Sequence, residues 1–124
     1  MTDVSPDAVA ESVPDAQPEL PRRRRLIRRP SFSIGDLDVT AGRSAIGELP
    51  VSRLVTGTQI SIPVNVFHGR HDGPVMWLSA AVHGDEIGGV EIIRRALASI
   101  DPKTLAGTIV AVPIVNVHGF LNGD

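Results

Sequence analysis

Two apolar runs, separated by a segment with helical spacing, constrain the fold of this chain more than any other feature. The first run covers residues 75–82 (VMWLSAAV) and the second covers residues 108–115 (TIVAVPIV). Runs of this length are typical of strands that are covered on both faces. Strand, helix and strand with short connections predict a βαβ unit with parallel strands. The helix should bury one apolar stripe, which consists of Ile87, Val90, Ile93, Leu97 and Ile100.

The segment before this unit predicts further strands. Residues 51–55 are strand-like, residues 56–58 form a turn, and residues 60–67 alternate with the period of two that a half-exposed strand shows. Pro63 has no backbone N–H to donate, which favours an edge position. Residues 68–74 (HGRHDGP) predict a loop, in which we expect His68 and His71 to be surface residues and not metal ligands. Only one helix is predicted, so the α/β architecture is expected to be incomplete.

The first 30 residues differ in composition from the rest. Residues 1–20 are acidic and rich in proline, and an arginine run (PRRRRLIRRP) follows at residues 21–30. Such a segment has too little apolar surface to bury, and we predict disorder for residues 1–30. We interpret the run as a solvated linker; the alternatives are a nucleic-acid or nuclear-targeting patch and, over residues 28–31, a kinase site. An irregular lead-in is expected at residues 31–49, and a domain at residues 50–124.

Composition excludes several kinds of site and partner. The 124 residues contain no Cys, so disulfides and thiolate ligands are excluded, and a metal would be held by His, Asp and Glu. A net charge of −2 gives no general attraction to nucleic acid or to an anionic membrane. No apolar run reaches the ~20 residues of a membrane-spanning helix, and the acidic N-terminus does not look like a signal peptide. We expect a cytoplasmic protein with neither a membrane nor a nucleic acid as its partner.

The motif HGDE follows the first apolar run directly. His83 is therefore expected at the carboxyl end of a strand, where open α/β sheets bind their ligands, and Glu86 in the first turn of the helix. Imidazole nitrogen and carboxylate oxygen are both good zinc donors. Gly84 permits a tight turn, and Gly88 and Gly89 leave room for a substrate or another backbone. The motif thus suggests a metal site.

The spacing alone also allows an interpretation without a metal. Asp85 would then be the N-cap of the helix, and Glu86 a first-turn carboxylate that the helix dipole favours. His83 would be a hydrogen-bonded residue at the end of the strand.

The stretch VHGDEIGGVEIIRRAL, with GTIVAVPIVNVHGF after it, resembles the succinylglutamate desuccinylase/aspartoacylase family of zinc carboxypeptidase-like hydrolases. The resemblance covers residues 50–124. It implies the N-terminal part of a zinc-carboxypeptidase-like α/β/α sandwich, whose mixed sheet contains one βαβ unit. It also implies that His83 and Glu86 are two of three protein ligands of one Zn²⁺ ion, and that Asp85 orients His83.

The end of the chain departs from the family in one position and stops short of its other functional residues. In NVHGF, Val117 stands where the family frequently has proline, and Asn116 is expected near the rim of the active site. His118 is in the wrong place to be the third zinc ligand. By the resemblance, that ligand, the general base and the substrate-binding arginines are expected beyond residue 124.

The resemblance predicts a zinc-dependent hydrolase that removes the acyl group from small N-acyl amino acids or related amides and esters. A metal-activated water would attack the acyl carbonyl. With two of the three ligands, the chain is expected to be truncated and inactive alone. The alternative is a non-catalytic α/β module with a basic interaction arm and a relic metal site.

Overall fold

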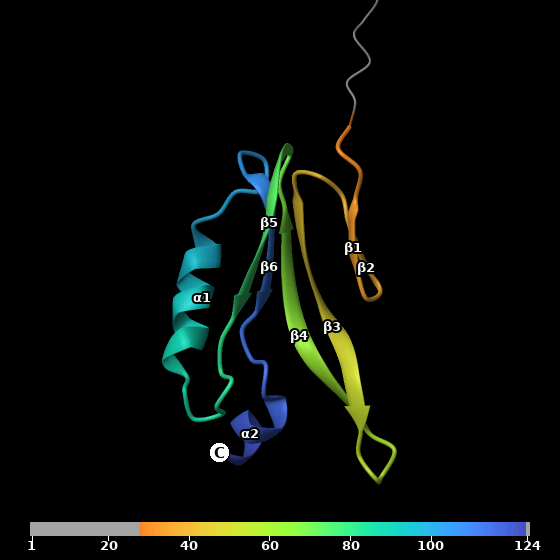
Figure 1. Cartoon of the computed structure of the whole chain (residues 1–124), viewed down its shortest axis with the longest axis vertical. Coiled ribbons are helices and arrows are strands. Elements are labelled where there is room, and N and C mark those ends of the chain that lie inside the picture. The colour runs from red at the N-terminus through yellow and green to blue at the C-terminus, as the bar shows by residue number, and fades with distance from the viewer. Residues whose placement is uncertain (1–27, 124) are drawn as a thin grey trace, which may run out of the picture.

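The computed structural model of the protein describes residues 28–123, so most of the predicted disordered segment lies outside the described residues. Figure 1 shows its elements in the order β1 (Phe32–Ile34), β2 (Leu37–Val39), β3 (Arg43–Arg53), β4 (Gln59–His68), β5 (His71–Ser79), α1 (Gly88–Ala98), β6 (Ala106–Val112) and α2 (Val117–Asn122). Strands β1 and β2 form a hairpin, and the other four form a sheet in the order β3-β4-β6-β5. Only β5 and β6 of this sheet pair in parallel. The prediction of an α/β fold with a mixed sheet is confirmed.

The predicted βαβ unit is present as β5, α1 and β6. Trp77 pairs with Val110 and Leu78 with Ala111 in the parallel register. Helix α1 lies on one side of the sheet, and the β1–β2 hairpin lies on the other (Figure 1). The apolar stripe is buried only in part, because Ile87 precedes the helix and is 62% exposed. Neither helix of the described residues has the length and apolar character to cross a membrane.

The best-packed core lies between the sheet and the β1–β2 hairpin. Val66 of β4 and Val110 of β6 are register partners, so their side chains share one face of the sheet. Removal of these side chains from water is the main favourable contribution to the stability of this layer. The fully buried members of the cluster are Val39, Val64, Val66, Val110 and Val112.

The prediction of an irregular lead-in at residues 31–49 is wrong. This segment holds β1, β2 and the first part of β3, and Phe32 and Ile34 pack against the core. Gly35, at φ +55°, makes the tight turn of the β1–β2 hairpin. Strands of three residues are too short for a period of two to be recognised, because that signal needs four to eight residues.

Strand β5 is not covered on both faces, in contrast to the prediction. Within residues 28–123 it is an edge strand next to β6, and α1 lies over one face only. Val75, Met76 and Trp77 are each more than half exposed. A continuous apolar run identifies a strand correctly, but it does not reveal the position of that strand in the sheet.

The edge position predicted from Pro63 is also wrong, since β4 lies between β3 and β6. The pairing of β4 with β6 begins only at Asn65. Pro63 therefore lies beyond the stretch that pairs with β6, which explains how an internal strand tolerates a proline.

The predicted loop at residues 68–74 is mostly strand. Strand β4 ends at His68 and β5 begins at His71, so Gly69 and Arg70 alone form the connection. A Cβ on Gly69 would lie 2.3 Å from the carbonyl oxygen of Leu105, and only glycine fits there. His71 is exposed as predicted, whereas His68 is 3% exposed. Burial of His68 is tolerated because both of its ring nitrogens have hydrogen-bond partners.

We expect the valine core to control the stability of the chain. Val64→Ala removes two methyl groups from a site with no exposed surface, which should lower the free energy of unfolding by about 2 kcal/mol. Val55→Ala is the matched control, because Val55 is fully exposed, and it should change the stability by less than about 0.5 kcal/mol. Urea denaturation of both variants tests this, and equal losses would contradict the placement of the core.

The acid stability of α1 should depend on Glu91. Hydrogen bonds from Arg94 and then Arg95 lower the pKa of the Glu91 carboxyl to about 2. A lowered pKa stabilises the folded state above the unfolded-state pKa of about 4.3, and this contribution is lost as the pH falls through about 2. Glu91→Gln should therefore flatten the decline of the urea midpoint between these pH values. Glu48→Gln, at another exposed glutamate, should not, and 1 M salt should reduce the difference because the pairs are exposed. An identical acid limb in Glu91→Gln would refute the assignment.

Candidate functional site

The HGDE motif lies in the connection from β5 to α1, at the carboxyl ends of the two parallel strands. Figure 1 shows this connection and α2 at the same end of the sheet. Backbone hydrogen bonds join them: the Val115 N–H donates to the Ala80 oxygen at 3.0 Å, and the Asn116 N–H donates to the Ala81 oxygen at 3.1 Å. The segments that follow the two parallel strands are thus held side by side, as the topology requires.

A tight turn brings the two predicted ligands to its two ends. The Glu86 N–H donates to the carbonyl oxygen of His83 at 3.1 Å, and the Ile87 N–H donates to that of Asp85 at 3.0 Å. The side chains of His83, Asp85 and Glu86 are all exposed. The turn predicted from Gly84 is confirmed, whereas the roles of His83, Glu86 and Asp85 toward a metal stay predictions.

Close packing against α2 fixes the position of this turn. Gly84 is buried, and a Cβ on it would lie 2.0 Å from the carbonyl carbon of Gly119. Gly119 is itself held by Asn116, whose side-chain oxygen accepts a hydrogen bond from the Gly119 N–H at 2.8 Å. Gly84 is therefore needed for the approach of α2 as well as for the turn. Asn116 lies beside the HGDE turn and caps α2.

Ala81 adds strain to the same region. It has φ +48°, the left-handed conformation that glycine prefers, and it is 3% exposed. Such a conformation costs a residue with a side chain roughly 1–2 kcal/mol. Strain of this kind tends to be retained next to functional sites, because the surrounding structure holds it in place. Its position two residues before His83 supports the choice of the turn as the candidate site.

The structure corrects the start of the helix. Helix α1 begins at Gly88 with Ile87 as its N-cap, and no side chain caps it. Glu86 is therefore not in the first helical turn, and Asp85 is not an N-cap, so this part of the interpretation without a metal is wrong. The residues that the sequence pattern assigned to the start of the helix form the turn between His83 and Glu86 instead. The acidic residue of the first turn is Glu91.

The imidazole of His83 and the carboxylate of Glu86 are suitable zinc ligands, but they are only two. Within residues 28–123, no three His, Asp or Glu side chains gather as they would around a metal ion. A catalytic zinc ion needs three protein ligands and one open position. His118 is not a third donor at the turn: it is exposed on α2, where the Asn122 side-chain amide donates to its Nε2 at 3.1 Å.

Two features near the site were missed by the sequence analysis. Helix α2 was not predicted, although Asn116 before it and Gly123 after it, at φ +75°, are typical cap residues. Between α2 and the tip of the β3–β4 hairpin lies a cavity of about 380 Å³, which does not include the HGDE turn. It is lined by Val51, Ser52, Leu54, Ile60, Ile62, Val115, Asn116, Val117 and His118.

Comparison with known proteins gives a consistent result. Residues 72–124 match the model of the succinylglutamate desuccinylase/aspartoacylase catalytic domain. No curated protein matches the chain. Among solved structures, an aspartoacylase family protein from Mesorhizobium loti is 26% identical, with a TM-score of 0.60 over 77% of this chain and 29% of that one. A succinylglutamate desuccinylase/aspartoacylase from Rhodobacter sphaeroides is 27% identical, with a TM-score of 0.56 over 73% of this chain and 29% of that one.

A third similar structure is that of an ectoine utilization protein from Ruegeria pomeroyi with bound product. It is 27% identical, with a TM-score of 0.56 over 69% of this chain and 27% of that one. The chain thus spans less than a third of the length of each of these proteins. The HGDE turn lies inside the matched residues. Residues 72–124 are therefore similar to part of the catalytic domain of the succinylglutamate desuccinylase/aspartoacylase family.

Proposed function

We propose that this chain is part of a zinc-dependent hydrolase that deacylates N-acyl amino acids or similar small amides and esters. The family is named after desuccinylases and aspartoacylases, which are hydrolases. The observation that supports the proposal most is the HGDE turn, which stands at the carboxyl ends of β5 and β6 within the family-matched residues. When bound, zinc would polarise the acyl carbonyl and lower the pKa of a coordinated water.

Each residue of the turn would have its own role at such a zinc site. His83 would offer a ring nitrogen and Glu86 a carboxylate oxygen, from the two ends of one hydrogen-bonded turn. Asp85 would accept a hydrogen bond from the other ring nitrogen of His83 and so fix its tautomer. Gly84, packed on Gly119, would keep the two donors in place relative to α2.

We further propose that the 124 residues are inactive by themselves. The described residues provide no group of three His, Asp or Glu side chains, so a third ligand has to come from outside residues 28–123. The same holds for the general base and for groups that bind the substrate carboxylate. The cytoplasmic location expected from the sequence stays a prediction.

His83→Ala in the complete protein should abolish zinc retention and turnover of N-acyl amino acids together, because it removes one of the three ligands. Glu86→Ala should do the same. His118→Ala is the matched control: it removes an exposed histidine from the neighbouring helix and should leave the zinc content unchanged. Metal analysis by mass spectrometry and a deacylation assay measure both effects.

Full zinc occupancy in His83→Ala would refute the ligand assignment. The non-catalytic alternative has its own test on the 124-residue chain. If this chain binds zinc no more tightly than its His83→Ala, Glu86→Ala double variant does, the relic site is favoured for the isolated chain.

Asp85→Asn should weaken zinc binding by roughly 10–100-fold without abolishing it, as expected for a residue that orients a ligand. The zinc dissociation constant of the complete protein, measured by competition with a chelating dye, provides the test. An unchanged constant would exclude Asp85 as the partner of His83, and complete loss of zinc would make it a ligand instead.

A further inference from the structure

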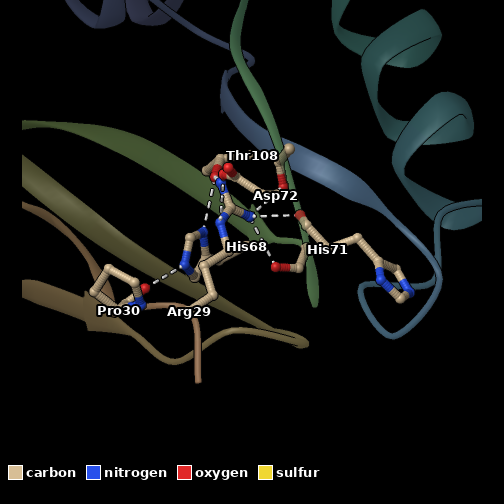
Figure 2. A network of polar contacts seen from close by, with 8 residues as sticks. Arg29, Pro30, His68, His71, Asp72 and Thr108 are labelled. Carbon is tan, nitrogen blue, oxygen red and sulfur yellow. Dashed lines mark hydrogen bonds and ion pairs between the residues drawn. The ribbon is translucent and has the colours of Figure 1, made fainter. Parts of the chain in front are cut away.

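A network of polar contacts ties Arg29 and Pro30 to the sheet (Figure 2). It lies at the starts of β5 and β6, the end of the sheet opposite the HGDE turn. The Nη1 group of Arg29 donates to the carbonyl oxygens of Gly69, His71 and Gly107 at 2.8, 3.1 and 3.0 Å. Its Nη2 group donates to Thr108 Oγ1 at 3.2 Å. The Arg29 side chain is 13% exposed. One guanidinium thus joins the end of β4 to the starts of β5 and β6.

His68 connects the same network to Pro30, the residue after Arg29. Residues 28–30 are called the arm below. The Nε2 of His68 lies 2.8 Å from the carbonyl oxygen of Pro30, and its Nδ1 lies 2.7 Å from Thr108 Oγ1. A carbonyl oxygen can only accept, so Nε2 carries the hydrogen. In the neutral ring Nδ1 is then an acceptor, so the Thr108 hydroxyl, which accepts from Arg29, donates its own hydrogen to Nδ1. All four groups are satisfied only if the imidazole is neutral.

Protonation of His68 would disturb this arrangement. It would place a second N–H on Nδ1, directed at Thr108 Oγ1, and the hydroxyl hydrogen would lose its acceptor. It would also add a positive charge near the Arg29 guanidinium, because the Thr108 hydroxyl contacts both groups. Both effects oppose the docking of the arm, and a buried group that loses its partner is costly.

The charged groups around His68 do not reverse this effect. Asp72 of β5, 97% exposed, is paired with Arg29 at 3.6 Å. Asp38 of β2 is exposed, and hydrogen bonds from Ser33 and then Ser31 lower its pKa, with a smaller contribution from His68. Its attraction to a protonated His68 is screened by solvent. The ring of Phe32, whose centroid lies 5.8 Å from that of His68, is apolar.

We propose that residues 28–30 form a pH-sensitive clamp, which is docked on the sheet while His68 is neutral and is released when His68 is protonated. Release would free the three carbonyl oxygens to which Arg29 donates. Unlike the zinc proposal, this inference depends only on contacts at the other end of the sheet.

The sequence offers a direct test, because it contains no Cys. Arg28→Cys, at an exposed residue of the arm, carries a nitroxide label whose spectrum reports the mobility of the arm. Between about pH 8 and 5, the range in which histidine titrates, the ratio of mobile to immobile label should rise on the order of tenfold. The same rise should occur with His71→Gln, the matched control at an exposed neighbour. It should be absent with His68→Gln, which cannot be protonated.

A label mobility that does not change with pH would overturn the clamp, and so would an unchanged response in His68→Gln. A second measurement uses the unsubstituted chain and does not depend on the folding of a variant. In NMR spectra, the His68 ring nitrogens and the Arg29 and Ser31 amides should shift with one common midpoint. Titration of His68 without a change in those amides, or no titration of His68 down to pH 5, would equally overturn the proposal.

Discussion

The parallel pairing of β5 with β6 is the constraint on which the rest of the structure depends. Because parallel strands need a crossover, α1 has to lie over the sheet, and the segments after both strands have to meet at one end. The backbone bonds from Val115 and Asn116 to Ala80 and Ala81 follow from this arrangement. The HGDE turn is positioned by the strand pair before it and by α2 beside it.

Glycines allow the segments that follow β5 and β6 to pack in close contact. Gly84 and Gly119 approach each other so closely that no side chain fits at Gly84. Together with the left-handed conformation of Ala81, this packing restricts where the side chains of His83 and Glu86 can lie. A site that has to hold a metal ion at fixed distances benefits from such restriction.

Strand β4 and the unit of β5, α1 and β6 were predictable from the sequence, because their apolar patterns extend over many residues. The parallel unit is the clearest case, and the family resemblance of the HGDE stretch is confirmed for part of the catalytic domain. Burial was not predictable in the same way. The burial of His68 depends on Thr108 and Pro30, which are distant in sequence, and the exposure of Trp77 depends on strand order. Neither fact is present in a local pattern.

The central claim is that His83 and Glu86 bind one zinc ion in the complete protein. Anomalous diffraction at the zinc absorption edge, from crystals of that protein, tests it most directly. The account predicts a single strong peak at about 2.0–2.2 Å from a ring nitrogen of His83 and from a carboxylate oxygen of Glu86. A peak bound by other residues, with His83 and Glu86 facing solvent, would contradict it.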